Sequence, residues 1–182
     1  DFVLDSASCV VTPNGNGSFS PSNFTVPSGK TVTCTFINKK KGHIIIDKET
    51  DPRGNTTPFD FRTTGSGYAD FQLTDFVQPA NTVNMLNDQY LAPGNYSVRE
   101  LVPNTWALSN ISCQITDNAP LGDSSFLIRG DPGTPDSDFD LNDDRVSFEL
   151  GPGDTISCKF TNKLGGLRMT LHNMTTSRSL DP

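Results

Sequence analysis

The chain has 182 residues, with 14 Lys and Arg against 21 Asp and Glu, so its formal net charge is 14 − 21 = −7. This acidic balance argues against a nucleic-acid partner, because binding to phosphates depends on clustered Lys and Arg and the only basic run is residues 39–41. No apolar run approaches the roughly 20 residues that a membrane helix needs. The first residues lack the basic start and apolar stretch of a signal peptide, so in a secreted protein they would belong to the mature form.

Alternation of apolar and polar residues, bounded by Gly and Pro, predicts short strands throughout the chain. In chain order, these strands are expected near residues 2–11, 19–26, 30–37, 43–49, 58–63, 69–75, 82–88, 95–101, 106–116, 124–129, 145–150, 154–161 and 167–173. No segment carries a convincing helical period. Strands and turns at this spacing predict an all-β, Ig-like antiparallel sandwich.

The sequence contains an internal repeat. Residues 26–40 align with residues 150–164 at a constant offset of 158 − 34 = 124, and residues 2–9 align with residues 106–113 at 113 − 9 = 104. The identical residues at aligned positions include Cys34 and Cys158, Phe36 and Phe160, Asn38 and Asn162, and Lys39 and Lys163. The repeat is therefore a module, and its first copy has no counterpart of residues 43–104.

This comparison divides the chain into three parts. Residues 1–41 form the back half of an Ig-like module, residues 42–164 form a complete module, and residues 165–182 form a C-terminal tail. In the tail, Leu167, Met169 and Leu171 alternate with polar residues after a glycine pair, in the place that residues 42–48 occupy after the first copy. The tail is thus expected to be a first strand without its own domain.

Four cysteines in an acidic, Ser/Thr-rich chain favour an oxidising compartment. Four cysteines allow three pairings, and the repeat makes Cys9 equivalent to Cys113 and Cys34 equivalent to Cys158. A rule of pairing within each module gives Cys9–Cys34 and Cys113–Cys158, each worth about 2 to 4 kcal/mol. No Cys/His spacing predicts a metal site, so the remaining alternative to the disulfides is four buried free thiols.

Three polar residues stand at the ends of apolar strands: Lys48, Glu100 and Asn162. In the stretches around them, at residues 46–51, 92–103 and 160–162, the sequence resembles the Cna B-type, or SpaA-like, prealbumin-fold domains of surface proteins and pilins. That family carries a Lys in its first strand, a Glu after a Pro-Gly turn and an Asn in a final F-x-N motif. The resemblance covers residues 42–164 fully and residues 1–40 as a back half.

The resemblance implies an intramolecular isopeptide bond between Lys48 and Asn162, with Glu100 as the proton shuttle. Burial would lower the pKa of the amine, so that it can attack in its neutral form, and raise the pKa of the carboxyl, so that it can polarise the amide. The alternative is a Lys and a Glu that pair at a sheet edge without a crosslink. The sequence carries none of the motifs G-x-S-x-G, H-E-x-x-H, P-loop or G-x-G-x-x-G, so no enzyme activity is expected.

Other residues give weaker signals. The acidic residues Asp136, Asp138 and Asp140 could offer oxygens to Ca²⁺, but the stretch lacks the Gly and Glu of an EF-hand, and a solvated loop is the simpler interpretation; no cofactor is otherwise expected. His43 and His172 are interpreted as strand residues, and Phe59 and the other aromatic residues as core. The N-x-S/T glycosylation motifs are at Asn16, Asn23, Asn55, Asn95, Asn110 and Asn173.

These observations lead to a structural hypothesis. The chain is expected to be an extracellular filament or pilus subunit that polymerises head to tail with copies of itself, the strand 167–173 completing the half-module 1–41 of a neighbour. Because His172 or Asn173 stands where Lys48 would and the tail has no Lys, the joint is expected to be non-covalent, or crosslinked by another lysine. The alternative is a segment of a repetitive cell-surface stalk or adhesin, and a third hypothesis is a carbohydrate- or host-binding module.

Overall fold

The computed structural model describes residues 1–13, 18–22, 24–76, 86–117, 123–130 and 135–165, and all regular structure in these ranges is β. The strands are β1 (Phe2–Thr12), β2 (Ser18–Phe19), β3 (Thr31–Lys40), β4 (Gly42–Asp51), β5 (Phe59–Thr64), β6 (Phe71–Leu73), β7 (Leu86–Leu91), β8 (Gly94–Leu101), β9 (Trp106–Thr116), β10 (Ser125–Gly130), β11 (Asp143–Leu150) and β12 (Thr155–Leu164). The expected all-β class is therefore confirmed.

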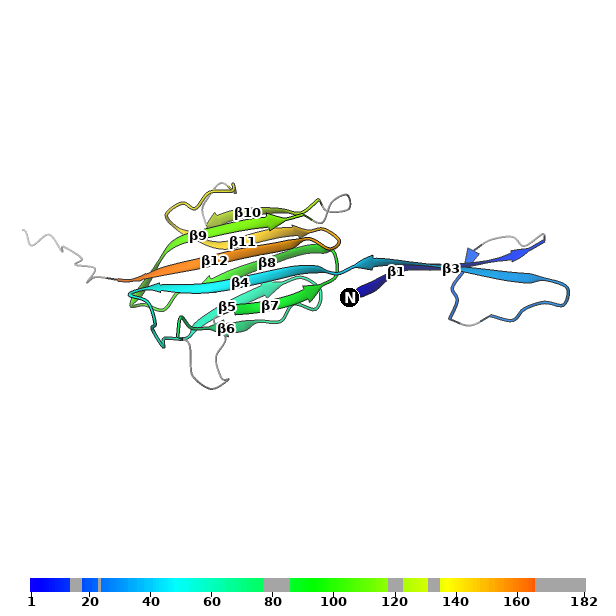
Figure 1. The fold of residues 1–182 in the computed structure, drawn as a ribbon, viewed down its shortest axis with the longest axis horizontal. Helices are drawn as coiled ribbons and strands as arrows, with labels where there is room; N and C mark the ends of the chain where they lie inside the picture. Colours follow the sequence, from blue (N-terminus) through cyan, green and yellow to red (C-terminus); the bar gives the residue numbers. More distant parts are fainter. Residues whose placement is uncertain (14–17, 23, 77–85, 118–122, 131–134, 166–182) are drawn as a thin grey trace, which may run out of the picture.

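Strands β4 to β12 form a sandwich of two sheets (Figure 1). One sheet has four strands in the order β7-β4-β12-β9, and the other has five in the order β10-β11-β8-β5-β6. Every pairing between these strands is antiparallel except that of β4 with β12, which is parallel. The first and last strands of the sandwich thus lie side by side at the centre of the four-stranded sheet.

The alternation in the sequence sets which side chains enter the core. Along β4, every second residue from Gly42 to Thr50 is buried, and β12 shows the same pattern from Ile156 to Asn162. The other sheet contributes Phe59 and Phe61 from β5, both almost fully buried. Because successive strand residues point to opposite faces, Lys48 and Asn162 fall on the same inward face as the isoleucines.

Residues 1–40 form a separate three-stranded sheet in the order β2-β1-β3, closed by the disulfide Cys9–Cys34. We refer to the antiparallel pair β1 and β3 as the hairpin. It projects from the end of the sandwich at which β4 begins, whereas β12 ends at the opposite end (Figure 1). Lys41 separates β3 from β4, and its backbone N–H donates to the carbonyl of Asp1 at 3.0 Å.

The hairpin reproduces the strand pair β9–β12 residue for residue. Cys9 lies opposite Cys34 as Cys113 lies opposite Cys158, and both pairs are disulfide-bonded. The register of β1 with β3 shifts between Leu4 and Ser6. The register of β9 with β12 shifts at the equivalent place, between Thr161 and Asn162. The internal repeat seen in the sequence is therefore also a repeat of strand register.

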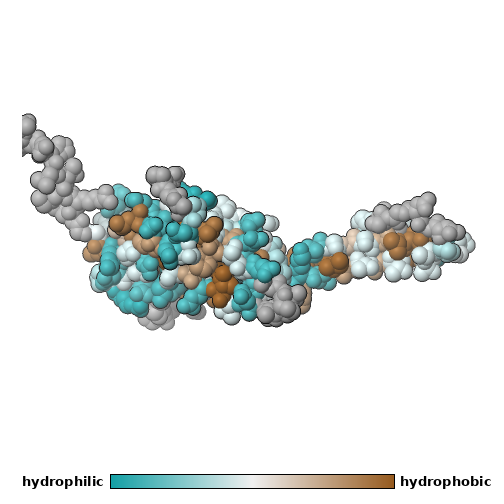
Figure 2. Space-filling view, turned by 90° about the horizontal axis from the view of Figure 1, so that it is seen from above, coloured by the Kyte–Doolittle hydropathy of each residue, from teal (hydrophilic) through white to brown (hydrophobic). Residues whose placement is uncertain are grey.

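The two copies differ in what covers them. Phe160 is fully buried in the sandwich, whereas its counterpart Phe36 is 56% exposed. Trp106 is 6% exposed, whereas the aligned Phe2 is 69% exposed. Hydrophobic residues are accordingly visible on the surface of the hairpin in Figure 2. The hairpin therefore presents core positions of a module without the sheet that would cover them.

Some strand boundaries differ from those predicted. The strand expected at 19–26 is limited to Ser18–Phe19. Its counterpart in the repeat is β11, which pairs with β10 and β8, and residues 1–40 contain no equivalents of those partners; Pro21 also removes a donor. Strand β3 continues to Lys40, three residues beyond the predicted end at residue 37. The expected strand 167–173 lies outside the described residues.

Candidate functional site

The candidate site lies between the two sheets, around the side chain of Lys48. Lys48 is fully buried on β4, and its Nζ donates hydrogen bonds to Asn162 Oδ1 at 2.6 Å, Glu49 O at 2.9 Å and Phe160 O at 3.1 Å. Since β4 and β12 are parallel and Phe160 is the partner of Lys48 in their register, Asn162 follows two residues further along the same face. The parallel pairing thus places the two side chains in contact.

Glu100 comes from the opposite sheet. It lies on β8, is 2% exposed, and its Oε1 is 3.5 Å from Lys48 Nζ. The structure therefore brings all three members of the predicted trio together. Strands β4, β8 and β12 each supply one of the three side chains from an inward face.

Burial shifts the pKa of Lys48 and that of Glu100 in the directions that favour their uncharged forms. The pKa of the Lys48 amine is lowered because the charged form loses its hydration, an effect that the nearby Glu100 carboxylate opposes. The pKa of the Glu100 carboxyl is raised by the same loss of hydration, which outweighs the attraction of the ammonium. Both directions are those that a neutral nucleophilic amine and a protonated acid require.

The site also contains polar atoms without ordinary partners. Among the described residues, neither carboxyl oxygen of Glu100 nor the amide nitrogen of Asn162 makes a hydrogen bond of standard geometry. Buried atoms of this kind are costly, because each forfeits its bonds to water. Such an arrangement suits a group that changes its bonding during a reaction.

An aromatic ring lies over the amine of Lys48. The ring centroid of Phe59 on β5 lies 4.2 Å from Lys48 Nζ, and Phe59 is itself fully buried. Phe59 was identified in the sequence only as a core residue, since the alternation of β5 fixes its face but not its neighbour across the core. Its ring covers one side of the amine and so contributes to the burial of Lys48.

The sequence did not indicate a second buried carboxylate, Asp75, which holds the turn after β4. Its Oδ2 accepts hydrogen bonds from Thr50 N at 3.0 Å, Thr50 Oγ1 at 2.7 Å and Gly54 N at 2.9 Å. Asp75 is 5% exposed, so these bonds are largely shielded from water. Its role is structural, because it fixes the end of the strand that carries Lys48.

Both predicted disulfides, Cys9–Cys34 and Cys113–Cys158, are present, and the chain contains no free cysteine. The alternative of four free thiols is therefore wrong. Cys9 and Cys158 are buried, and the bridge Cys9–Cys34 lies on the same uncovered face of the hairpin as Phe36.

The other predicted sites are not brought together into a functional cluster. Asp136, Asp138 and Asp140 are exposed, and no group of three or more His, Cys, Asp or Glu side chains in the described ranges is placed to hold a metal ion. His43 lies on β4, hydrogen-bonded to Asp88 and stacked on Tyr90. Among the glycosylation motifs, Asn95 and Asn110 are exposed and Asn55 is half-buried; Asn16, Asn23, Asn173 and His172 lie outside the described residues.

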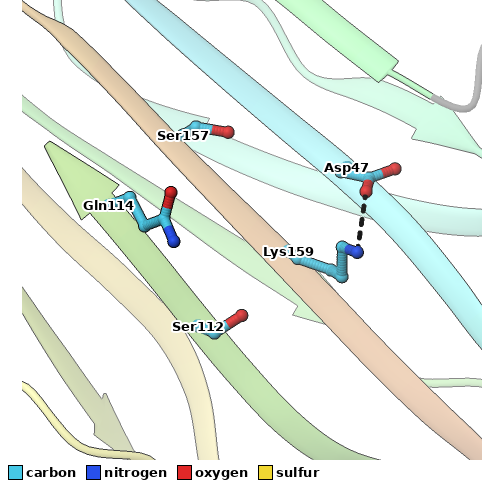
Figure 3. A pocket seen from close by; sticks show the side chains of 5 residues that line it. All are labelled: Asp47, Ser112, Gln114, Ser157 and Lys159. Carbon is cyan, nitrogen blue, oxygen red and sulfur yellow. Dashed lines mark ion pairs between the residues drawn. The ribbon is translucent and has the colours of Figure 1, made fainter. Parts of the chain in front are cut away.

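A shallow polar groove crosses the outer face of the four-stranded sheet (Figure 3). It has a volume of about 250 Å³ and is lined by Asp47, Ser112, Gln114, Ser157 and Lys159. Lys159 Nζ lies 3.6 Å from Asp47 and 3.1 Å from Glu49, so the charges in the groove are already paired. The groove has no aromatic lining on which a sugar could stack.

Comparison with known proteins agrees with the fold. The family model SpaA_4, described as a prealbumin-like fold domain, matches residues 44–164, which is more than half of the chain. The protein therefore belongs to this family of SpaA-like prealbumin domains, a type of domain found in pilins and other surface proteins. No curated protein and no solved structure shows significant similarity to the chain.

Two broader properties follow from this assignment. A prealbumin-like domain of this type is generally a structural fold without enzymatic activity. Its occurrence in surface proteins, together with the two disulfides, indicates an oxidising extracellular environment. Within the described residues, no helix has the length and apolar character needed to span a membrane.

Proposed function

We propose that this protein is a structural subunit of an extracellular filament or pilus, with a sandwich closed by an isopeptide bond and a hairpin that joins it to the next subunit. The observation that carries the assembly is the hairpin, which repeats the register of β9–β12 while leaving Phe36 and Phe2 exposed. A small sheet with an open edge, such as β2-β1-β3, gains stability when another strand pairs with it. A strand from a neighbouring copy, residues 167–173, would supply that pairing.

The bond within the sandwich would form between Lys48 Nζ and Asn162 Cγ. The neutral amine attacks the amide carbon, the Cγ–Nδ2 bond breaks, and the departing nitrogen leaves as ammonia. Glu100 takes the proton that the amine loses and delivers it to the leaving nitrogen, so it is unchanged at the end. The contact at 2.6 Å between Nζ and Oδ1 and the directions of both pKa shifts support this reaction.

Intact mass spectrometry of the disulfide-reduced protein tests the bond. The mass is expected to fall short of the sequence mass by one ammonia, and Glu100→Ala and Lys48→Arg should each restore the full mass. Suitable controls are Glu149→Ala and Lys159→Arg, because both side chains lie outside the core and their loss should leave the deficit unchanged. A wild-type mass equal to the sequence mass would show that no bond forms.

Negative-stain electron microscopy tests the assembly. The chain 1–182 is expected to form filaments, and deletion of residues 167–182 should abolish them while the mass deficit remains. Head-to-tail contacts of this kind use two different surfaces and therefore give open polymers rather than closed dimers. Filaments formed by the shortened chain would contradict strand donation.

A second candidate is a segment of a longer surface stalk in which such modules follow one another. The direct passage from β3 through Lys41 into β4 favours it, because successive modules would then be joined by a single residue. In that arrangement, the uncovered face of the hairpin would pack against a front half that belongs to the same polypeptide. A purified chain 1–182 that remains monomeric at high concentration would favour the stalk.

A further inference from the structure

One edge of β3 has no partner strand among the described residues, whereas the equivalent edge of β12 pairs with β4. In the sandwich, β12 is hydrogen-bonded on both sides, antiparallel to β9 and parallel to β4. Strand β3 repeats β12 and pairs with β1, the counterpart of β9, on one side. On its other side, no strand of the described residues is paired with it.

We propose that this edge accepts residues 167–173 of a second copy as a parallel strand, with Arg168 opposite Thr33 and with Leu167, Met169 and Leu171 facing the same side as Val32, Cys34 and Phe36. This inference rests on the strand donation proposed above and specifies its direction and register. It treats the pairing of β4 with β12 as the template for the joint between subunits.

The register follows from that template. In the sandwich, Ile44, Ile46 and Lys48 lie opposite Ile156, Cys158 and Phe160, and all six are buried. Subtracting the repeat offset of 158 − 34 = 124 places the second set at Val32, Cys34 and Phe36. The three apolar residues of the tail recur with the period of two that these three inward positions require.

A shift of one residue would exchange the two faces of the donated strand. It would place Arg168, Thr170 and His172 against the apolar face and expose the three apolar residues, which sheet pairing strongly disfavours. A shift of two residues would keep the face but place Leu171 opposite Asn38 or Leu167 opposite Lys30. The register with Leu167 opposite Val32 therefore matches all three apolar residues of the tail to the three inward positions, including the exposed Phe36.

The same register explains why this edge of β3 would accept an apolar strand without lysine. In this register Leu171 lies opposite Phe36 and takes the position of Lys48, which the alignment of the sequence alone gave to His172 or Asn173. A strand such as β4 would place an inward ammonium there, and residues 1–41 contain no glutamate at all, so the charge would lack a counterpart of Glu100. The joint is therefore non-covalent and selective for an apolar strand without lysine.

Engineered cysteines test the register in the full chain. The double variant Thr33→Cys and Arg168→Cys places its thiols on paired residues of neighbouring strands, which lie about 4.8 Å apart and within the range that a disulfide spans. The matched variant Thr33→Cys and Met169→Cys pairs the same residues only after a shift of one. Both leave Val32, Cys34 and Phe36 in place, and the fluorescence of the single, buried Trp106 reports whether the sandwich has folded.

We expect a ladder of disulfide-linked multimers on a non-reducing gel from the Arg168 variant, with peptide mapping joining residues 33 and 168, and none from the Met169 variant. A ladder from the Met169 variant would overturn the register, and a linked monomer would overturn the second copy as the source of the strand. If the wild-type chain forms filaments and neither variant gives a ladder, parallel pairing in this register is wrong and the filament proposal stands. A wild-type chain that stays monomeric would defeat both.

Discussion

Asn38 and Asn162 occupy the same position in two strand pairs of identical register, but Asn162 is fully buried and Asn38 is exposed. The difference comes from the surroundings of each residue, since both follow a Phe by two residues and both precede a Lys. Around Asn162 the sandwich supplies Lys48 from β4 and Glu100 from β8. Residues 1–40 contain no counterpart of either strand, so the same F-x-N motif is a candidate crosslink site in one copy and a surface feature in the other.

Replacing Asn162 by Ala should remove the crosslink and lower the free energy of unfolding by about 3 to 5 kcal/mol, since a bond that closes a long loop restricts the unfolded chain as a disulfide does. The matched variant is Asn38→Ala, whose exposed side chain should change stability by about 0.5 kcal/mol at most. Urea denaturation followed by Trp106 fluorescence measures both. Equal midpoints for the two variants would argue against a crosslink at Asn162.

The uncrosslinked sandwich should depend on pH through Glu100. Because burial raises the pKa of this carboxyl in the folded state, its stabilising contribution is complete below its ordinary pKa of about 4.5 and is lost as the pH rises through the raised value. In the Asn162→Ala background, the free energy of unfolding is therefore expected to decrease with rising pH more steeply when Glu100 is present than in the double variant with Glu100→Gln. Denaturation curves measured from pH 4 upward in both proteins provide the comparison, and parallel profiles would exclude this titration.

Loss of the Asp75 carboxylate should destabilise the turn after β4. In Asp75→Ala, the backbone N–H groups of Thr50 and Gly54 lose their acceptor, and we expect a cost of about 2 to 4 kcal/mol. Asp60→Ala is the matched control, because Asp60 is exposed and bonds only the side chain of Gln72 among the described contacts, so its loss should cost about 0.5 kcal/mol or less. Similar denaturation midpoints for the two variants would contradict the role given to Asp75.

The two disulfides should have separable effects. Replacing Cys113 and Cys158 by Ser should lower the unfolding free energy of the sandwich by about 2 to 4 kcal/mol. Replacing Cys9 and Cys34 should leave that value unchanged but make the hairpin sensitive to protease, because two exposed strands have little other stabilisation. Limited proteolysis with mass mapping distinguishes the two; cleavage within the sandwich of the second variant would show that the parts are coupled.

The sequence predicted the site better than some of the fold. Lys48, Glu100 and Asn162 could be found because the stretches around them resemble the SpaA-like motifs, and alternation along β4, β8 and β12 places each on an inward face. Phe59 could not be assigned to the amine, because contacts between sheets leave no periodic signal. The strand expected at 19–26 is mostly absent, since strand formation there depends on partner strands that the alternation of one segment does not reveal.

The parallel pairing of β4 with β12 also determines how the sandwich responds to tension. The chain enters at the start of β4, where His43 lies opposite Thr155, and leaves beyond the far end of β12, where Lys163 lies opposite Asp51. A pulling force on the two ends therefore slides these strands along each other in shear, so that their hydrogen bonds are strained together rather than one after another. With β3 joined to β4 through Lys41 alone, tension in the hairpin reaches this pair of strands directly.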